Sequence, residues 1–125
     1  MVMIMARAPL RLGLAGGGTD VEPYVSNFGG EVLNISINKY VYTELTELTS
    51  DKICLYDGSS DSLHTYTVGA VPESDDNLML CVYRYMAIKF NNGRYPALDL
   101  RTFSEVPFGS GLGGSSTATV SMMTA

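Results

Sequence analysis

The chain of 125 residues contains no tryptophan, one histidine and only two cysteines. Cys54 and Cys81 have neither the paired spacing of a zinc site nor the density of a disulfide scaffold, so we expect two buried thiols. His64 lies in an alternating segment, which favours a surface strand residue over a catalytic base. No Ser-His-Asp triad and no histidine-ligated metal site can be assembled from these residues.

Basic residues are also few. Eight Lys and Arg residues stand against thirteen Asp and Glu, for a net charge of −5, and no basic cluster occurs, so we expect no nucleic-acid partner. No apolar run is long enough to span a membrane, and residues 1–6, which lack a basic start, favour a first strand over a signal peptide. We therefore expect a cytoplasmic protein without a membrane partner.

The most informative segment is PFGSGLGGSSTA, residues 107–118, between a strand-like run at 97–103 and a helix-like run at 117–125. Its glycines permit positive φ and let main-chain N–H groups approach an anion, while the helix adds its positive dipole end. The pattern predicts a phosphate site. Ser115 and Ser116 would stand at the helix start, where a hydroxyl can cap the helix or reach a phosphate-bound cation.

Three other interpretations of this segment must be weighed. A Walker A loop is excluded because no lysine follows the glycines. Gly109, Gly111 and Gly114 do satisfy G-x-G-x-x-G, but the chain ends before the acidic ribose-binding residue of a dinucleotide site. A glycine-rich turn with a serine cap stays open as the simplest alternative.

A second glycine-rich segment, residues 7–24, contains the two arginines Arg7 and Arg11. They are four apart, so in an extended strand they would share a face, and each can clamp a phosphoryl group. Asp20 either accepts hydrogen bonds from sugar hydroxyls or caps a helix predicted at 21–28. Arg7 has the alternative of a solvated charge at a strand end.

Together the two segments resemble the GHMP family of small-molecule kinases. The later segment is similar to the family's ATP-phosphate motif, P-x-x-x-G-L-G-S-S-A, with Gly114 in place of the first serine. The resemblance implies ATP and Mg²⁺ as cofactors, with Ser115 holding the metal ion. It also implies an ATP site formed by Pro107, Gly109, Ser110, Gly111, Leu112, Gly113, Gly114, Ser115 and Ser116.

The earlier segment is similar, without a gap from Ala8 to Asp20, to the family's N-terminal substrate motif. The resemblance makes Arg11 the active-site arginine and Asp20 the sugar-binding aspartate. The implied substrate site contains Arg7, Gly17, Gly18, Thr19 and Asp20.

The choice of sugar depends on two glycines of this segment. Galactokinases carry glutamate and histidine at the positions of Gly17 and Gly18, and the smaller residues suit a larger or already phosphorylated sugar. The segment resembles most the D-glycero-D-manno-heptose 7-phosphate kinases, with L-fucokinases as near relatives. This implies phosphorylation of heptose 7-phosphate at the anomeric hydroxyl, with L-fucose or another sugar as the alternative.

The remaining pattern predicts an α+β fold. Alternation indicates strands at 32–48, 52–56 and 63–68, with a hairpin turn at 57–61. Residues 76–91 read as a helix with Asp75 or Asp76 as cap, Asn92-Gly93 as stop, and a core stripe of Leu78, Val82, Tyr85 and Ile88 or Lys89. We expect a mixed, largely antiparallel sheet with helices packed on one side, as in the N-terminal domain of the family.

We expect residues 1–125 to be an incomplete GHMP N-terminal domain, because the final helical run has no stop signal. The family's catalytic aspartate and third glycine motif would lie beyond Ala125, so the piece alone would lack kinase activity. The alternative from another functional class is a non-catalytic phosphate-binding or assembly module. In either case apolar surface left open would favour self-association.

Overall fold

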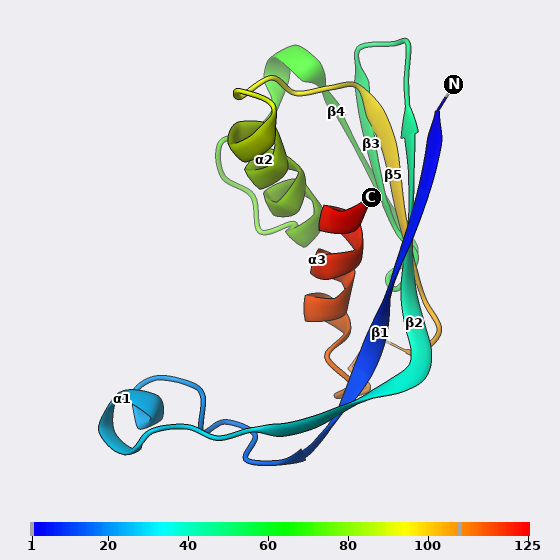
Figure 1. The fold of residues 1–125 in the computed structure, drawn as a ribbon. Helices are drawn as coiled ribbons and strands as arrows, with labels where there is room; N and C mark the ends of the chain where they lie inside the picture. The colour runs from blue at the N-terminus through cyan, green and yellow to red at the C-terminus, as the bar shows by residue number, and fades with distance from the viewer. Residues whose placement is uncertain (1, 108) are drawn as a thin grey trace.

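The computed structural model describes residues 2–107 and 109–125; Met1 of the predicted first strand and Phe108 of the glycine segment lie outside the described residues. Five strands form one sheet, in the order β1-β2-β5-β3-β4 (Figure 1). Their bounds are β1 Met3–Ala15, β2 Leu33–Glu47, β3 Lys52–Asp57, β4 Ser62–Thr67 and β5 Leu98–Ser104. The helices are α1 Tyr24–Phe28, α2 Leu78–Phe90 and α3 Gly114–Thr124, with a short 3₁₀ turn at Val68–Ala70.

All neighbouring strands pair antiparallel except β3 and β5, which run parallel. The parallel pair requires a long crossover, and α2 supplies it between β4 and β5. Helices α2 and α3 cover one side of the sheet, while the other side has no helix over it in the part of the chain described (Figure 1). The predicted fold class, a mixed and mostly antiparallel sheet with helices on one side, is confirmed.

The core lies between the sheet and these two helices. Alternate residues of each strand point inward, which buries Leu10 of β1, Ile53 and Leu55 of β3 and Leu100 of β5. Leu80 of α2 belongs to the same cluster as Ile53, Leu55 and Leu100 and is fully buried. Burying each of these side chains contributes roughly 1.5–3 kcal/mol to the free energy of folding, relative to leaving it exposed. This core holds α3, and therefore the loop before it, mainly against β1 and β2.

Helix α2 faces the core differently from the prediction. Of the predicted stripe only Val82 is buried, whereas Leu78, Tyr85 and Ile88 are exposed. The buried positions are Met79, Leu80, Val82, Tyr83 and Ala87. Because apolar residues occur all round this helix, their spacing could not fix which face packs inward.

This rotation of α2 explains the exposure of Cys81. Cys81 lies on the exposed side of α2, so the prediction of a buried thiol is wrong there, and Cys54 on β3 is half-buried.

The predicted N-terminal cap of α2, Asp75 or Asp76, is also wrong. Asn77 caps α2 by accepting from the N–H of Leu80 at 3.0 Å, while Asp75 accepts from the N–H of Asn77 and from the hydroxyl of Tyr66. His64 is an exposed residue of β4, as predicted.

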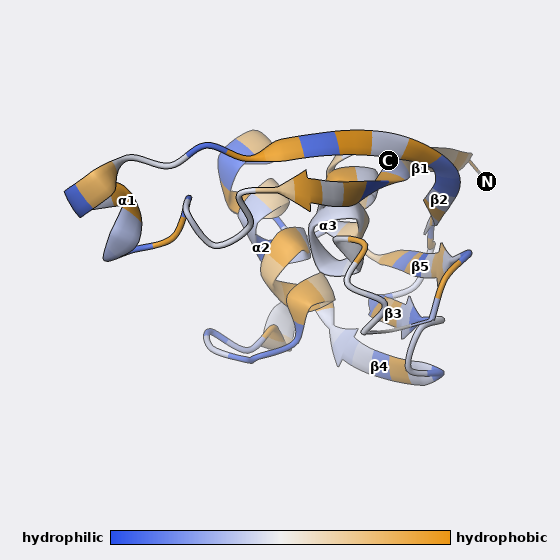
Figure 2. Ribbon diagram, turned by 90° about the horizontal axis from the view of Figure 1, so that it is seen from below, coloured by the Kyte–Doolittle hydropathy of each residue, from blue (hydrophilic) through white to orange (hydrophobic). Residues whose placement is uncertain are grey.

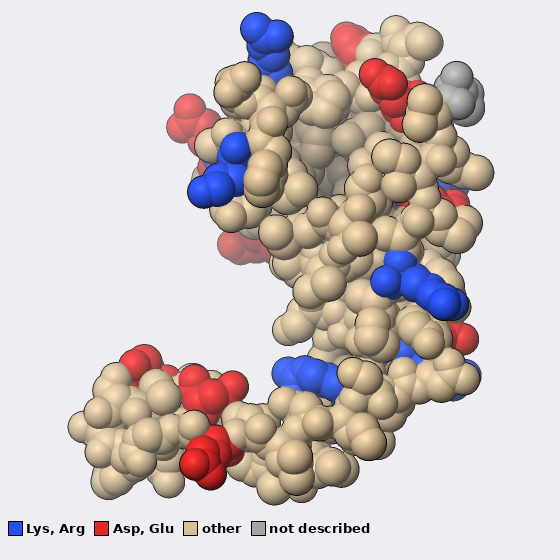
Figure 3. Space-filling model, viewed as in Figure 1, with Lys and Arg blue, Asp and Glu red and all other residues tan. Residues whose placement is uncertain are grey.

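The end of β1 and the start of β2 stay paired and project beyond the other strands as a two-stranded ribbon. We call this ribbon, with the loop and helix that it carries, the arm (residues 11–36). It carries α1 at its tip, well away from the helix layer (Figure 1). The space-filling view shows acidic side chains gathered on this tip and a hollow between the arm and the body (Figure 3). Asp20, Glu22 and Glu31 are the acidic residues of the arm.

Apolar residues also lie exposed along the arm (Figure 2), among them Leu14, Val21, Phe28, Leu33 and Ile35. In the described residues, no helix is both long and apolar enough to cross a membrane.

Candidate phosphate and substrate site

The glycine segment forms a loop that leads directly into α3. Gly109, Gly111 and Gly113 all have positive φ, near +75°, a conformation that side chains disfavour. The first helical hydrogen bond joins the N–H of Thr117 to the carbonyl oxygen of Gly113 at 2.9 Å. The N–H groups of Gly114, Ser115 and Ser116 come before that bond, so they have no partner within the helix.

No serine caps this helix. Gly113 is the N-cap residue, in the left-handed conformation, and no side chain makes a capping bond. The open alternative of a simple serine-capped turn is therefore wrong, because the hydroxyls of Ser115 and Ser116 are not used in that way. Three amides without a partner in the helix, the positive end of the helix dipole and two hydroxyls instead meet at one place, which is a set of donors that fits an anion.

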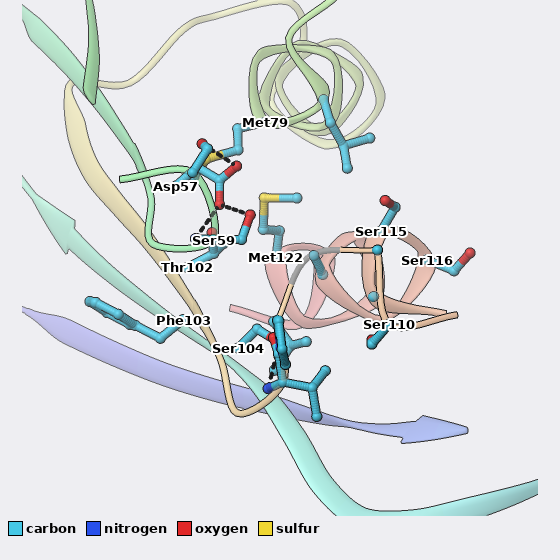
Figure 4. Close-up of a pocket in the computed structure, with 18 of the residues that line it drawn as sticks. Asp57, Ser59, Met79, Thr102, Phe103, Ser104, Ser110, Ser115, Ser116 and Met122 are labelled. Atoms are coloured by element: carbon cyan, nitrogen blue, oxygen red, sulfur yellow. Dashed lines mark hydrogen bonds between the residues drawn. The ribbon is translucent and has the colours of Figure 1, made fainter. Parts of the chain in front are cut away.

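This loop is one wall of a cavity of about 570 Å³ between the sheet, α2 and α3 (Figure 4). Ser110, Ser115 and Ser116 lie on one side of it, and Asp57 and Ser59 of the β3–β4 turn lie on the other. Met79 and Met122 lie between the two sides. The glycine-loop side, which is rich in hydrogen-bond donors, and the apolar middle suit a ligand that combines phosphates with a flat, apolar group.

The wall formed by the β3–β4 turn was not predicted to belong to a site. Asp57 accepts from the N–H of Ser59 at 2.9 Å, from its hydroxyl at 2.7 Å, and from the hydroxyl of Ser60 at 3.0 Å. Partial burial raises the pKa of Asp57, but these hydrogen bonds outweigh burial and hold the pKa below its ordinary value. The hairpin was predicted from the same residues, yet only the fold brings it opposite the glycine loop.

Arg11 joins the arm to the glycine loop. Its N–H donates to the carbonyl oxygen of Leu112 at 3.2 Å, and its side chain passes so close to Gly113 that a Cβ there would lie 3.2 Å from Nε. The guanidinium also donates to Oδ1 of Asn34 at 2.8 Å. The two segments singled out in the sequence, residues 7–24 and 107–118, thus meet at one point.

Arg7 lies elsewhere. Its guanidinium sits 4.6 Å from the ring centroid of Tyr40. Tyr40 is paired with Pro9, on the side of the sheet opposite the buried Ala6 and Ala8. The register of β1 shifts between Pro9 and Arg11, and this irregularity breaks the alternation on which the shared face depended. The prediction that the two arginines share a face is therefore wrong.

The chain is similar to a family model, to a kinase sequence and to a solved kinase structure. A family model described as the GHMP kinases N terminal domain matches residues 77–125. The D-glycero-alpha-D-manno-heptose 7-phosphate kinase of Campylobacter jejuni is 37% identical over 126 residues, which cover 100% of this chain and 37% of that relative. A crystal structure of a D-glycero-D-manno-heptose 1-phosphate kinase from Bacteroides thetaiotaomicron matches with a TM-score of 0.83 and 34% identity, over 98% of this chain and 40% of that one.

The chain belongs to the GHMP kinase family. It also shares its fold with a Methanococcus jannaschii mevalonate kinase, at a TM-score of 0.78 and 18% identity, over 98% of this chain and 38% of that one. The chain therefore spans 37–40% of the length of these three kinases.

In this GHMP kinase domain, the residues predicted for ATP lie together. Those that line the cavity are Pro107, Gly109, Ser110, Gly111, Gly113, Gly114, Ser115 and Ser116. Leu112 contributes its carbonyl oxygen to Arg11 instead. The described residues contain no group of three or more His, Cys, Asp or Glu side chains that could hold a metal ion. A Mg²⁺ ion here would depend on phosphate oxygens and water, with Ser115 as a hydroxyl ligand.

The predicted sugar-binding residues occupy the arm. Gly17 and Gly18 have open space where a Cβ would be, and Asp20 is exposed. Thr19 has a structural use, because its hydroxyl donates to the carbonyl oxygens of Gly16 and Glu31 at 2.7 and 3.0 Å and closes the loop below α1. Asp20 does not cap α1, whose N-cap is Pro23 and has no side-chain bond, so that alternative is wrong.

Proposed function

We propose that this chain is the N-terminal domain of an ATP-dependent sugar kinase, and that the whole protein phosphorylates D-glycero-D-manno-heptose 7-phosphate at its anomeric hydroxyl. The observation that carries the proposal is the junction of Arg11 with the glycine loop at the start of α3. This junction sets a cation beside three free amides, on the arm that would hold the sugar. The 37% identity to a heptose 7-phosphate kinase along the whole chain favours this sugar.

The two parts of the site would divide the reactants between them. The glycine loop and the first turn of α3 would bind the ATP phosphates, with Mg²⁺ held by Ser115 and phosphate oxygens. The apolar middle of the cavity and the β3–β4 turn would receive the nucleoside. Arg11 would face the phosphoryl group that is transferred, where a guanidinium offsets the charge of the transition state.

The arm would hold the sugar. Asp20 would orient its hydroxyls, and the open space beside Gly17 and Gly18 leaves room for a bulky substrate. Arg7 stays a candidate for a remote phosphate on the sugar, although in this structure it stacks on Tyr40. The part of the protein outside residues 1–125 would supply the general base and the facing wall of the sugar site.

The proposal is tested with the full-length protein and a panel of acceptors. We expect ATP-dependent turnover on heptose 7-phosphate that exceeds turnover on L-fucose and D-galactose, with the phosphate attached at the anomeric carbon by ³¹P and ¹³C NMR. Preference for fucose would keep the sugar kinase and change its substrate. Absence of turnover on all three sugars, with nucleotide binding retained, would favour a non-catalytic binding module.

A further inference from the structure

Asn34 makes a contact that neither the sequence pattern nor the proposed function requires. It pairs with Gly13 across the arm, two residues beyond Arg11 on β1. Residues in this diagonal relation lie on the same side of a two-stranded ribbon, within reach of long side chains. The amide of Asn34 lies beside Gly13, where an added Cβ would be 3.5 Å from Oδ1, and this Oδ1 accepts from Nη1 of Arg11 at 2.8 Å.

Arg11 needs such a partner because its side chain is exposed and long. A free arginine loses up to about 2 kcal/mol of rotamer freedom when it is held in one place. The side chain is held near Nε where it passes Gly113, and the hydrogen bond that Nη1 donates to Asn34 fixes its guanidinium end. Together they hold the guanidinium beside the first turn of α3.

The chemistry of the acceptor also matters. Within residues 2–107 and 109–125, the ion pairs are Lys39–Glu105 and Arg101–Asp99, so the charge of Arg11 is not offset by a carboxylate. Its neighbour, the start of α3, is itself positive. An amide oxygen holds the guanidinium without neutralising it, so the whole charge remains for an anion that binds between Arg11 and the helix.

We propose that Asn34 is a positioning residue, which fixes the Arg11 guanidinium beside the start of α3 while leaving its charge free for the transferred phosphoryl group. The proposal rests on the proposed kinase function. It assigns Asn34 an effect on rate that works through Arg11. A purely structural role in the arm would not depend on Arg11 at all.

The test uses the full-length protein with the variants Asn34→Ala, Asn34→Asp, Arg11→Ala and the double variant Asn34→Ala/Arg11→Ala. Asn34→Ala should lower kcat on the order of tenfold with KM for ATP within about twofold, because a contact to the transition state has been loosened. Asn34→Asp keeps the geometry and pairs with the charge of Arg11, so it should not restore kcat. The double variant should be no slower than Arg11→Ala, because Asn34 then has nothing to position.

Asn38→Ala is the matched control, since Asn38 is an exposed residue of the same type on the same strand. Its kcat should equal that of the unaltered protein. Losses that multiply in the double variant, or full activity of Asn34→Asp, would overturn the proposal.

A readout without turnover separates this inference from the proposed function. In ¹⁵N-arginine NMR spectra, the side-chain Nε–H signal of Arg11, identified by its loss in Arg11→Ala, should shift and broaden in Asn34→Ala and stay unchanged in Asn38→Ala. An unchanged Arg11 signal in Asn34→Ala refutes the positioning role even if the protein is an active kinase. A shifted signal in a protein that phosphorylates no sugar refutes the proposed function and leaves the positioning intact.

Discussion

The N–H of Arg11 donates to the carbonyl oxygen of Leu112 at 3.2 Å, so the arm and the glycine loop are joined through their main chains. The bond lies where β1 shifts register and, still paired with β2, begins to project as the arm. An irregular strand frees an N–H that a regular ladder would have used, and here that N–H reaches the loop. The position of the guanidinium is thus set first by the backbone and only then by Asn34.

Gly113→Ala should disturb this junction. The residue has φ +75°, and an added Cβ would lie 3.2 Å from Nε of Arg11. We expect a loss of about 1–2 kcal/mol in the free energy of unfolding, together with reduced phosphoryl transfer. Gly114→Ala is the control: it starts the helix with open space around it, so its stability should be unchanged or slightly higher. Chemical denaturation measures the free energy of unfolding of both variants. Equal losses in the two variants would contradict the role of Gly113.

Arg11→Ala and Asp20→Ala should have different kinetic effects. Arg11 lies beside the glycine loop, so under the proposed function its removal should reduce kcat much more than it weakens nucleotide binding. Asp20 is exposed on the arm, and its removal should mainly raise KM for the sugar. Steady-state kinetics with each substrate varied in turn measures both. An exchange of these two effects would reverse the assigned roles.

Ser115→Ala tests the metal site. Because Gly113 and not a serine is the N-cap, removing this hydroxyl should leave the thermal midpoint within about 2 °C. We expect a higher Mg²⁺ concentration at half-maximal rate and a lower kcat. Thr124→Ala, at the other end of α3, is the control, since its hydroxyl only bonds the carbonyl oxygen of Val120 in the same helix. A Mg²⁺ dependence unchanged in Ser115→Ala would remove this residue from the metal site.

Much of this fold was predictable because local pattern and packing agree. The strands and the hairpin at Asp57 follow from alternation and turn residues, and the helices at α2 and α3 were expected within a few residues of their bounds. The face of α2 was not predictable, because a helix that is apolar on every side takes its rotation from the sheet that it meets.

The candidate site likewise has parts that local sequence predicts and parts that only the folded chain determines. The glycine loop and the arm could be found from their own residues, since their positive φ values require glycine and so appear in the sequence. The separation of Arg7 from Arg11 could not, because it depends on a register shift that strand alternation does not encode. Asn34 carries no motif, and its place beside Arg11 is a product of strand pairing.

The loop at the base of the arm should tolerate change at one glycine and not at its neighbour. A Cβ on Gly16 would lie 1.9 Å from the carbonyl oxygen of Glu31, and its φ is +76°. Gly17 has no atom within 4 Å of that position. We expect Gly16→Ala to unfold the arm locally and raise KM for the sugar, while Gly17→Ala leaves protection of the arm amides unchanged. Hydrogen exchange measured for residues 11–36 compares the two, and similar exchange in both variants would contradict the packing described.

Asp57→Asn should change how stability depends on pH. The pKa of Asp57 lies below its ordinary value of 3.8, so the folded state favours the carboxylate. A lowered folded pKa adds stability that is present above the unfolded pKa and is lost as pH falls through the folded one. The difference in unfolding free energy between the unaltered protein and Asp57→Asn should therefore be largest above pH 5 and shrink below pH 4. Comparing the two proteins at each pH cancels the other carboxylates, which titrate in both. Ser60→Ala removes one hydrogen-bond donor to Asp57. The unfolding free energy of Ser60→Ala should therefore exceed that of Asp57→Asn above pH 5, but by less than the unaltered protein does. A gap between the two proteins that is constant from pH 3 to pH 6 would show that the charge of Asp57 does not stabilise the β3–β4 turn.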